Sequence, residues 1–269
     1  MVSSSGIGGQ NRYIQQAQQG VATSAQRIAS GLRINSAADD AAGLAISNRL
    51  TANTTAFSQS IRNASDGISL AQTASGSLSN VTDNIQRLRE LSIQSANGIL
   101  NDSDRKAIAA EANQLGAEIA RVIENSSFNN VPLLSNSGGI SIQVGGESDD
   151  NINIQTADLQ QKLSDLGFAN LNLGSAEGAQ NALGVLDELQ GSVDSAAIEF
   201  GASINRFEST INTLSNSRVN AEASRSRIQD ADIARESSEL ARFQVMKDVA
   251  IALQVQANNN NASVLNLLG

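Results

Sequence analysis

The segment LDELQGSVDSAAIEFGASINRFESTINTLSNSRVNAEASRSRI, residues 186–228, decides the fold. An apolar residue recurs at every seventh position along it: Leu186, Val193, Phe200, Phe207, Leu214, Ala221 and Ile228. Such a row keeps facing one partner only if the helices wind around each other, because a straight α-helix has about 3.6 residues per turn. The segment therefore predicts a long helix that packs in a bundle or coiled coil.

Similar rows occur near both ends of the chain. The N-terminal row comprises Ile7, Ile14, Val21 and Ile28. The C-terminal row comprises Phe243, Ala250, Ala257 and Val264, accompanied by Met246, Leu253 and Leu267. Pairing of the two rows within one monomer is one interpretation. However, Val245, Val249 and Val255 widen the C-terminal row beyond what one partner helix can cover, which favours packing between subunits.

The residues before the heptad segment predict three further helices. Residues 10–32 are expected to be helical and to break at Gly31. Apolar positions then step by threes and fours from about Gly43 to Ala96, which predicts a second long helix, although Gly67 and Gly76 weaken it. A turn at 97–104 precedes a third helix that ends near residue 125. We expect Asp102 or Ser103 to cap that helix.

The apolar period changes to two in the middle of the chain. The alternating residues are Ile140, Ile142, Val144, Ile152 and Ile154. They predict one β-hairpin, after a turn at Asn129-Asn130. We expect 163–173 to be irregular and Ser175 to cap the heptad helix. The fold class is therefore mainly α: a long antiparallel helical bundle or coiled coil with one small β-hairpin, plus terminal coiled-coil helices.

Composition argues against several functions. The chain has no Cys and no His, so the commonest general base near neutral pH and the usual zinc ligands are missing. A net charge of −9 argues against binding to nucleic acid, and no run of apolar residues is long enough to predict a membrane span. The start of the chain lacks the pattern of a cleaved signal peptide, so export is expected to use another route.

Acidic and glycine pairs are the remaining motifs that could carry chemistry. Asp230 with Asp232 and Asp149 with Asp150 lack the ligand series of a calcium loop, and capping or solvation explains them better. Gly138-Gly139 and Gly145-Gly146 lack the context of a nucleotide-binding loop. We therefore expect no catalytic residue, no metal site and no cofactor. Eleven acids against one base between Glu124 and Glu199 suggest an outward-facing, solvated surface.

Several long motifs, in order, resemble those of bacterial flagellins. They are SGLRINSAADDAAGLAI at 30–46, RNASDGISLAQT at 62–73, QRLRELSIQSAN at 86–97, SFNN at 127–130, SRSRIQDADIARE at 224–236 and VLNLLG at 264–269. The match is nearly full-length. Larger relatives carry outer domains between these motifs, and this chain is too short there to contain them. Residues 2–20 depart from the family pattern, which leaves the innermost contacts open.

The resemblance implies a non-enzymatic subunit that assembles with itself into the extracellular filament used for motility. It implies an inner-core helix at 1–42, a bundle with a hairpin near 140–155 at 43–228, and a second inner-core helix at 229–269 that pairs with the first. It also implies contacts with an export chaperone and with cap and hook-junction proteins. Recognition by Toll-like receptor 5 would involve Arg87, Leu91 and Glu111, whose alternative role is packing between subunits.

Three other functions compete with this interpretation. A hook–filament junction protein resembles flagellins at both ends and would differ in occupying only the filament base. A helical signalling rod would need a membrane span or a sensory domain, and the sequence predicts neither. An enzyme would need an activity hidden in the central segment, which the absence of His and Cys argues against.

Overall fold

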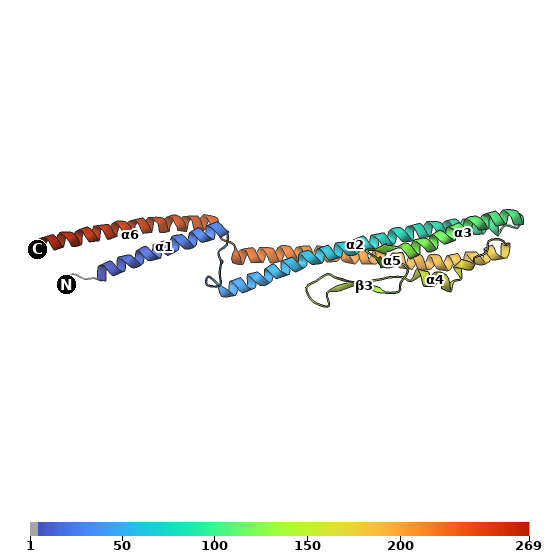
Figure 1. Ribbon diagram of the computed structural model, residues 1–269, viewed down its shortest axis with the longest axis horizontal. Coiled ribbons are helices and arrows are strands. Elements are labelled where there is room, and N and C mark those ends of the chain that lie inside the picture. Colours follow the sequence, from blue (N-terminus) through green and yellow to red (C-terminus); the bar gives the residue numbers. More distant parts are fainter. Residues whose placement is uncertain (1–4, 269) are drawn as a thin grey trace. The chain divides into compact units, whose positions relative to one another are not determined.

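The computed structural model describes the backbone of residues 5–268 and the side chains of residues 11–260, 262 and 263 (Figure 1). The helices are α1 (Ser5–Ser30), α2 (Ala41–Ser95), α3 (Asp102–Asn125), α4 (Leu159–Asp165), the 3-10 helix η1 (Phe168–Asn170), α5 (Ala176–Gln229) and α6 (Ile233–Leu268). The strands are β1 (Ser127–Phe128), β2 (Val131–Pro132), β3 (Gly139–Gln143) and β4 (Asn151–Gln155). The expected mainly helical fold is confirmed. The chain divides into two packing units, residues 55–218 and residues 1–54 with 219–269.

The heptad row forms the centre of the first unit. Leu186, Val193, Phe200, Phe207 and Leu214 are all at most 8% exposed. The first four of them belong to one apolar core with residues of α2 and α3. Helix α5 runs unbroken for 54 residues around this row, which confirms the predicted long helix. Ser175 caps it, because the amide of Gly178 donates to the Ser175 hydroxyl at 3.1 Å.

Helix α2 is also continuous, through both of the glycines that weakened its prediction. Gly67 is buried, and a Cβ atom added there would lie 2.7 Å from the Phe207 ring and 2.8 Å from Ile142. The missing side chain lets the aromatic ring and the hairpin approach the α2 backbone. Gly67 therefore serves packing and does not interrupt the helix.

The turn between α2 and α3 is held by a buried arginine. Arg105 is 8% exposed, and its guanidinium donates to the carbonyls of Ser95, Asn97 and Leu100. The predicted cap of α3 was wrong by one or two residues: Asn101 is the cap, and its side chain accepts from the amide of Asp104. Asp102 and Ser103 instead begin the helix, and the negative charge of Asp102 lies in its first turn, where the helix dipole favours it.

The predicted hairpin is present, with β3 and β4 antiparallel in the register Ile140 to Ile154 and Ile142 to Ile152. Ile152 and Ile154 are buried, and the Asn63 amide of α2 donates to the Gln143 carbonyl at 2.9 Å. The hairpin therefore lies against α2.

Two short features differ from the sequence prediction. Strands β1 and β2 form a second antiparallel pair around the turn at Asn129 and Asn130, both of which have positive φ. Residues within 163–173, expected to be irregular, contribute to α4 and form η1. Leu163 and Phe168 of this segment are buried, as is Leu159 at the start of α4. Apolar packing therefore stabilises helices too short to show a clear period.

The second unit contains α1, α6 and the adjoining ends of α2 and α5. Gly31 ends α1 with φ +70, as the predicted break requires. The connector after α1 is hydrogen-bonded to the end of α5 and to the connector that follows α5. The amide of Arg33 donates to the Gln229 carbonyl at 2.6 Å, and that of Ala231 donates to the Gly31 carbonyl at 2.9 Å. The boundaries between the packing units lie within α2, after residue 54, and within α5, after residue 218. The filament domains predicted at 1–42, 43–228 and 229–269 remain predictions.

Candidate functional site

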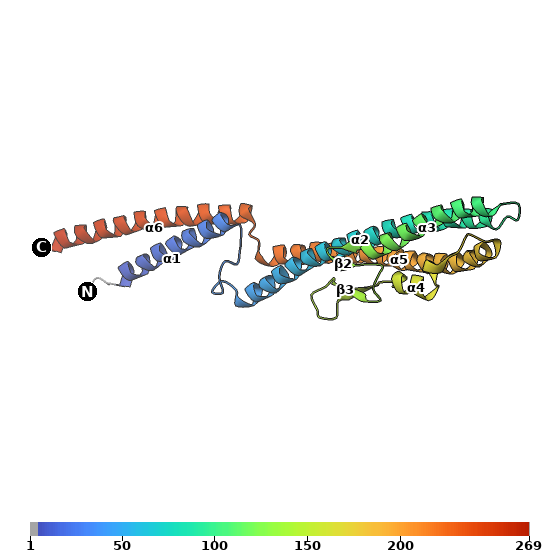
Figure 2. The same ribbon diagram turned by 45° about the vertical axis from the view of Figure 1, so that its right-hand side comes forward.

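Helices α1 and α6 lie side by side, as both views of the chain show (Figures 1 and 2). Polar contacts join them at two levels. The Gln254 side-chain amide donates to Asn11 Oδ1 at 3.0 Å, and Arg27 Nη1 lies 3.2 Å from Glu236 Oε1. The predicted terminal seam is therefore where the two ends of the chain meet.

The α1 side of this seam contains the predicted apolar row. Ile14, Val21 and Ile28 are partly buried, while Ala17 and Ser24 between them are 1% and 3% exposed. Ile7 lies outside the residues whose side chains are described. Small side chains at the centre of the seam let the two helix backbones approach closely.

Gly20 of α1 lies in close contact with Phe243 of α6. A Cβ atom there would lie 2.6 Å from carbon atoms of the Phe243 ring of α6. The Arg242 guanidinium carbon lies 5.1 Å from the centroid of the same ring, within the range of a cation–π contact. Phe243 is thus the best-anchored member of the predicted C-terminal row.

The rest of that row is only partly covered by α1. Ala250 and Ala257 are partly buried, whereas Met246 and Leu253 are 44% and 56% exposed. Val264 and Leu267 lie outside the described side chains. Further exposed apolar residues of α6 are Val245, Val249, Ile251 and Val255. An apolar groove of about 280 Å³, lined by α6 residues and Tyr13 of α1, lies along this face. One partner helix therefore leaves much of the apolar surface of α6 uncovered.

Charged residues surround the start of α6. Asp232 caps this helix by accepting from the amides of Ala234 and Arg235. A polar cleft of about 600 Å³ brings together Arg27, Arg33, Arg235, Asp230, Asp232, Glu236 and Glu239. Basic and acidic side chains are therefore nearly balanced in this cleft.

The residues predicted for receptor contact do not all share one environment. Arg87 Nη2 lies 2.8 Å from Glu111 Oε1, and Arg87 Nη1 lies 2.9 Å from Glu90 Oε2. Both members of the first pair are about half exposed. The hydrogen bond to Glu90, followed by that to Glu111, raises the pKa of Arg87 above its ordinary value. Leu91 is 2% exposed and lies in the core. Of the three residues, only Arg87 and Glu111 are therefore exposed at the surface.

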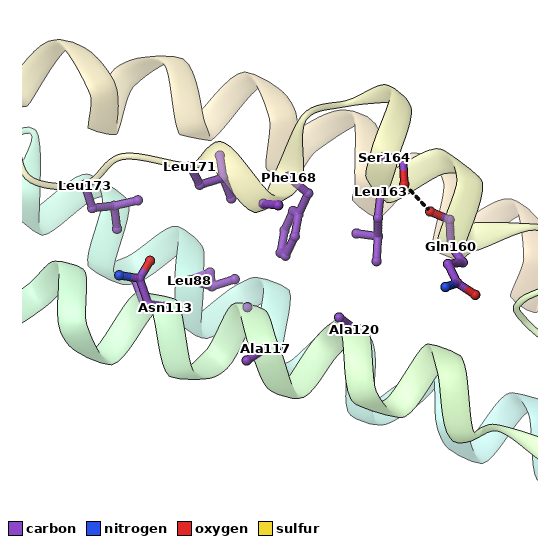
Figure 3. Close-up of a pocket in the computed structure, with 13 residues that line it drawn as sticks. Leu88, Asn113, Ala117, Ala120, Gln160, Leu163, Ser164, Phe168, Leu171 and Leu173 are labelled. Carbon is purple, nitrogen blue, oxygen red and sulfur yellow. Dashed lines mark hydrogen bonds between the residues drawn. The ribbon is translucent and has the colours of Figure 1, made fainter.

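A separate cleft of about 640 Å³ lies between α3 and the segment of α4 and η1. Figure 3 shows Leu163 and Phe168 pointing from that segment toward α3, where Ala117 and Ala120 leave space. Its lining is apolar apart from uncharged polar groups such as Asn113 and Gln160. Sequence reasoning missed this cleft because α4 was not predicted. No lining residue is ionisable, so the cleft offers no acid–base chemistry.

The described residues contain no group of three or more acidic side chains placed to hold a metal ion. Across the same part of the chain, none of the helices combines the length and apolar character needed to cross a bilayer. A buried core of long helices and a terminal helix pair with surplus apolar surface define the class of the fold: a mainly α protein built on long coiled helices.

Comparisons with known proteins give the family. The bacterial flagellin N-terminal helical region matches residues 9–138, and the C-terminal helical region matches residues 183–268. A flagellin of Halalkalibacterium halodurans is 37% identical over 90% of each chain, and one of Listeria monocytogenes is 32% identical over 95% of this chain and 94% of its own. The crystal structure of Bacillus cereus flagellin has a TM-score of 0.52 at 25% identity, covering 57% of this chain and 88% of that one.

The chain belongs to the bacterial flagellin family. It is a structural subunit of the flagellar filament, outside the cell, and not an enzyme. The subunit polymerises with itself.

Proposed function

We propose that the apolar face of α6 left uncovered by α1 is the surface through which subunits pack in the filament. The observation that carries the proposal is the exposure of Val245, Val249, Leu253 and Val255, each more than half accessible. Apolar burial contributes about 25 cal/mol per Å² removed from water, so covering this face with other copies stabilises the polymer relative to the monomer. The partly buried residues Ile14, Val21, Ile28, Phe243, Ala250 and Ala257 hold α1 and α6 together as one packing element.

The same surface accounts for the partners expected before and during assembly. An apolar helix face of this size promotes premature association in a free subunit, so an export chaperone covers it until export. Subunits at the two ends of the filament lack a neighbour on one side, and the cap and hook-junction proteins complete the packing there.

Recognition by Toll-like receptor 5 rests on the exposed pair Arg87 and Glu111. An arginine about half exposed keeps donors available to a partner carboxylate while Glu111 orients it. Leu91 contributes by holding α2 in the core and does not contact the receptor itself. Arg87 and Glu111 therefore form the receptor contact, and Leu91 supports the helix that carries Arg87.

Polymerisation of purified full-length chain tests the packing proposal. We expect Leu253→Ser to raise the critical concentration for salt-induced or seeded filament growth by about tenfold, because an apolar contact is lost from each subunit interface. Leu253→Met is the matched control, since it keeps an apolar side chain of similar volume. Equal critical concentrations for the serine variant and the parent chain would contradict the proposal.

A further inference from the structure

The turn between α2 and α3 contains the only Asn-Gly pair in the chain, Asn97-Gly98. Both residues are exposed, and they follow the last residue of α2, Ser95. Figure 1 shows the turn at the end of the paired helices α2 and α3. Nothing in the role of the filament subunit described above makes use of this pair.

An asparagine followed by glycine can lose its side-chain amide by an internal reaction. The Gly98 nitrogen gives up its proton to hydroxide and attacks Cγ of Asn97; an N–Cγ bond forms, the bond from Cγ to the amide nitrogen breaks, and ammonia leaves. Water then opens the cyclic imide at either carbonyl, giving aspartate or isoaspartate, with no change of oxidation state. Glycine favours the attack because it has no Cβ to crowd the ring.

Three hydrogen-bond donors in and beside this turn are placed to assist deprotonation of Gly98 and attack on Cγ of Asn97. The amide of Ile99 donates to Asn97 Oδ1 at 3.2 Å, which folds the carboxamide back over the next peptide and stabilises the oxyanion formed when Cγ is attacked. Arg105 Nη2 donates to the Asn97 carbonyl at 2.8 Å, and the Leu100 amide donates to it at 3.3 Å. That carbonyl belongs to the same peptide group as the attacking nitrogen. A cation there stabilises the negative charge that deprotonation of Gly98 places on the peptide.

The attacking amide is also accessible. Among the described residues, none accepts a hydrogen bond from the Gly98 nitrogen, so its proton can pass directly to solvent. Asp66-Gly67 could cyclise by related chemistry, but it lies inside α2 with Gly67 buried. The helix fixes the backbone there and prevents the ring from closing. The fold therefore allows cyclisation at Asn97-Gly98 and prevents it at Asp66-Gly67.

We propose that Asn97 is a site of spontaneous deamidation in the folded subunit, with water as the co-reactant and aspartate and isoaspartate as products. The reaction places a carboxylate close to the Arg105 guanidinium. Isoaspartate also adds one carbon to the main chain at the residue whose carbonyl Arg105 binds. Of the two products, isoaspartate is the one that loosens the turn.

The test compares the folded full-length chain with its own tryptic peptide. Cleavage after Arg89 and Arg105 releases residues 90–105, so digestion before incubation gives an unfolded reference of identical sequence. Both samples are kept in mildly alkaline buffer, and deamidation is assigned by fragment mass spectrometry and isoaspartyl methylation. We expect Asn97 to react in the folded chain at least as fast as in the peptide. Asn101, which caps α3, is expected to remain intact in the folded chain.

Two variants sharpen the result. Gly98→Ala retains the fold, because an added Cβ meets no atom within 4 Å and φ is not positive, and it is expected to slow the reaction about tenfold. Arg105→Gln removes the tryptic site after residue 105, so its reference peptide is 90–106, released by cleavage after Lys106. The variant is expected to lower the ratio of the folded rate to the peptide rate, with circular dichroism confirming that it is folded. An unchanged or higher ratio would contradict the part assigned to Arg105. Reaction at Asn97 in the peptide but not in the folded chain would overturn the proposal.

Discussion

The Phe243 ring of α6 packs directly on Gly20 of α1, so closely that a Cβ atom at position 20 would lie 2.6 Å from the ring carbons. This contact fixes how near the two terminal helices approach. Val245 and Val249 of α6 are 62% and 51% exposed, so this contact covers only part of the apolar surface of the helix.

Replacing Gly20 should therefore separate the terminal helices. We expect Gly20→Ala to weaken the pairing of α1 with α6 by about 1–3 kcal/mol, through overpacking against the ring. Hydrogen exchange of α1 amides in the unpolymerised chain measures the effect as faster exchange. Gly76→Ala is the matched control, since nothing lies within 4 Å of the added Cβ and a helical alanine is favoured over glycine. Unchanged exchange in the Gly20 variant would show that the ring can move aside without cost.

The heptad core should be the most sensitive part of the bundle. Phe207 is fully buried beside Gly67, so Phe207→Ala should lower the free energy of unfolding by about 3–5 kcal/mol by leaving a cavity. Ile198→Ala on the same helix should change it by less than about 0.5 kcal/mol, because Ile198 is 70% exposed. Urea unfolding of both variants measures the difference. Similar losses for the two would argue against the packing of α5 described above.

The connector between α1 and α2 should respond to acid. Asp39 Oδ2 accepts from the Ser36 hydroxyl and from the amides of Ser36 and Asn35, and these bonds hold the pKa of Asp39 below its ordinary value of 3.8. A folded pKa below the unfolded one adds stability above pH 3.8 that is lost as the pH falls through the folded pKa. Nuclear magnetic resonance titration should show the lowered pKa, and Asp39→Asn should remove this part of the pH dependence. A pKa at or above 3.8 would contradict the hydrogen bonding.

Receptor recognition should depend on the exposed ion pair. Arg87→Ala and Glu111→Ala are expected to reduce Toll-like receptor 5 signalling while leaving the fold intact, because exposed ion pairs contribute little to stability. Arg121→Ala provides the control, since Arg121 makes a similar exposed pair with Glu118 on α3. A reporter assay with unpolymerised protein measures the response. Equal signalling from all three variants would show that Arg87 and Glu111 do not contribute to receptor binding.

The sequence predicted the long elements well because their periodicity repeats many times. The row from Leu186 to Leu214 is buried over four heptad steps, and the alternation around Ile152 and Ile154 matches the hairpin. Short elements were missed because two to seven residues give too few repeats. Helix α4 depends instead on tertiary packing, as the buried Leu159 and Leu163 show.

The candidate packing surface was only partly predictable from the sequence. The breadth of apolar residues on α6 predicted that one helix could not cover it, and the exposure of Val249 and Leu253 agrees with this. The close contact of Gly20 with Phe243 could not be predicted, because it depends on the relative rotation of two helices that are far apart in the sequence. Similarly, the burial of Leu91 next to exposed Arg87 depends on which face of α2 meets the core.

The central claim is that the uncovered face of α6 is buried between subunits. A reconstruction of the assembled filament by electron cryomicroscopy, at a resolution that places side chains, tests it most directly. The account predicts that Val245, Val249, Leu253 and Val255 contact the terminal helices of other copies and lose most of their solvent exposure. A filament in which these four side chains remain open to solvent, with subunits joined only through residues 55–218, would contradict it.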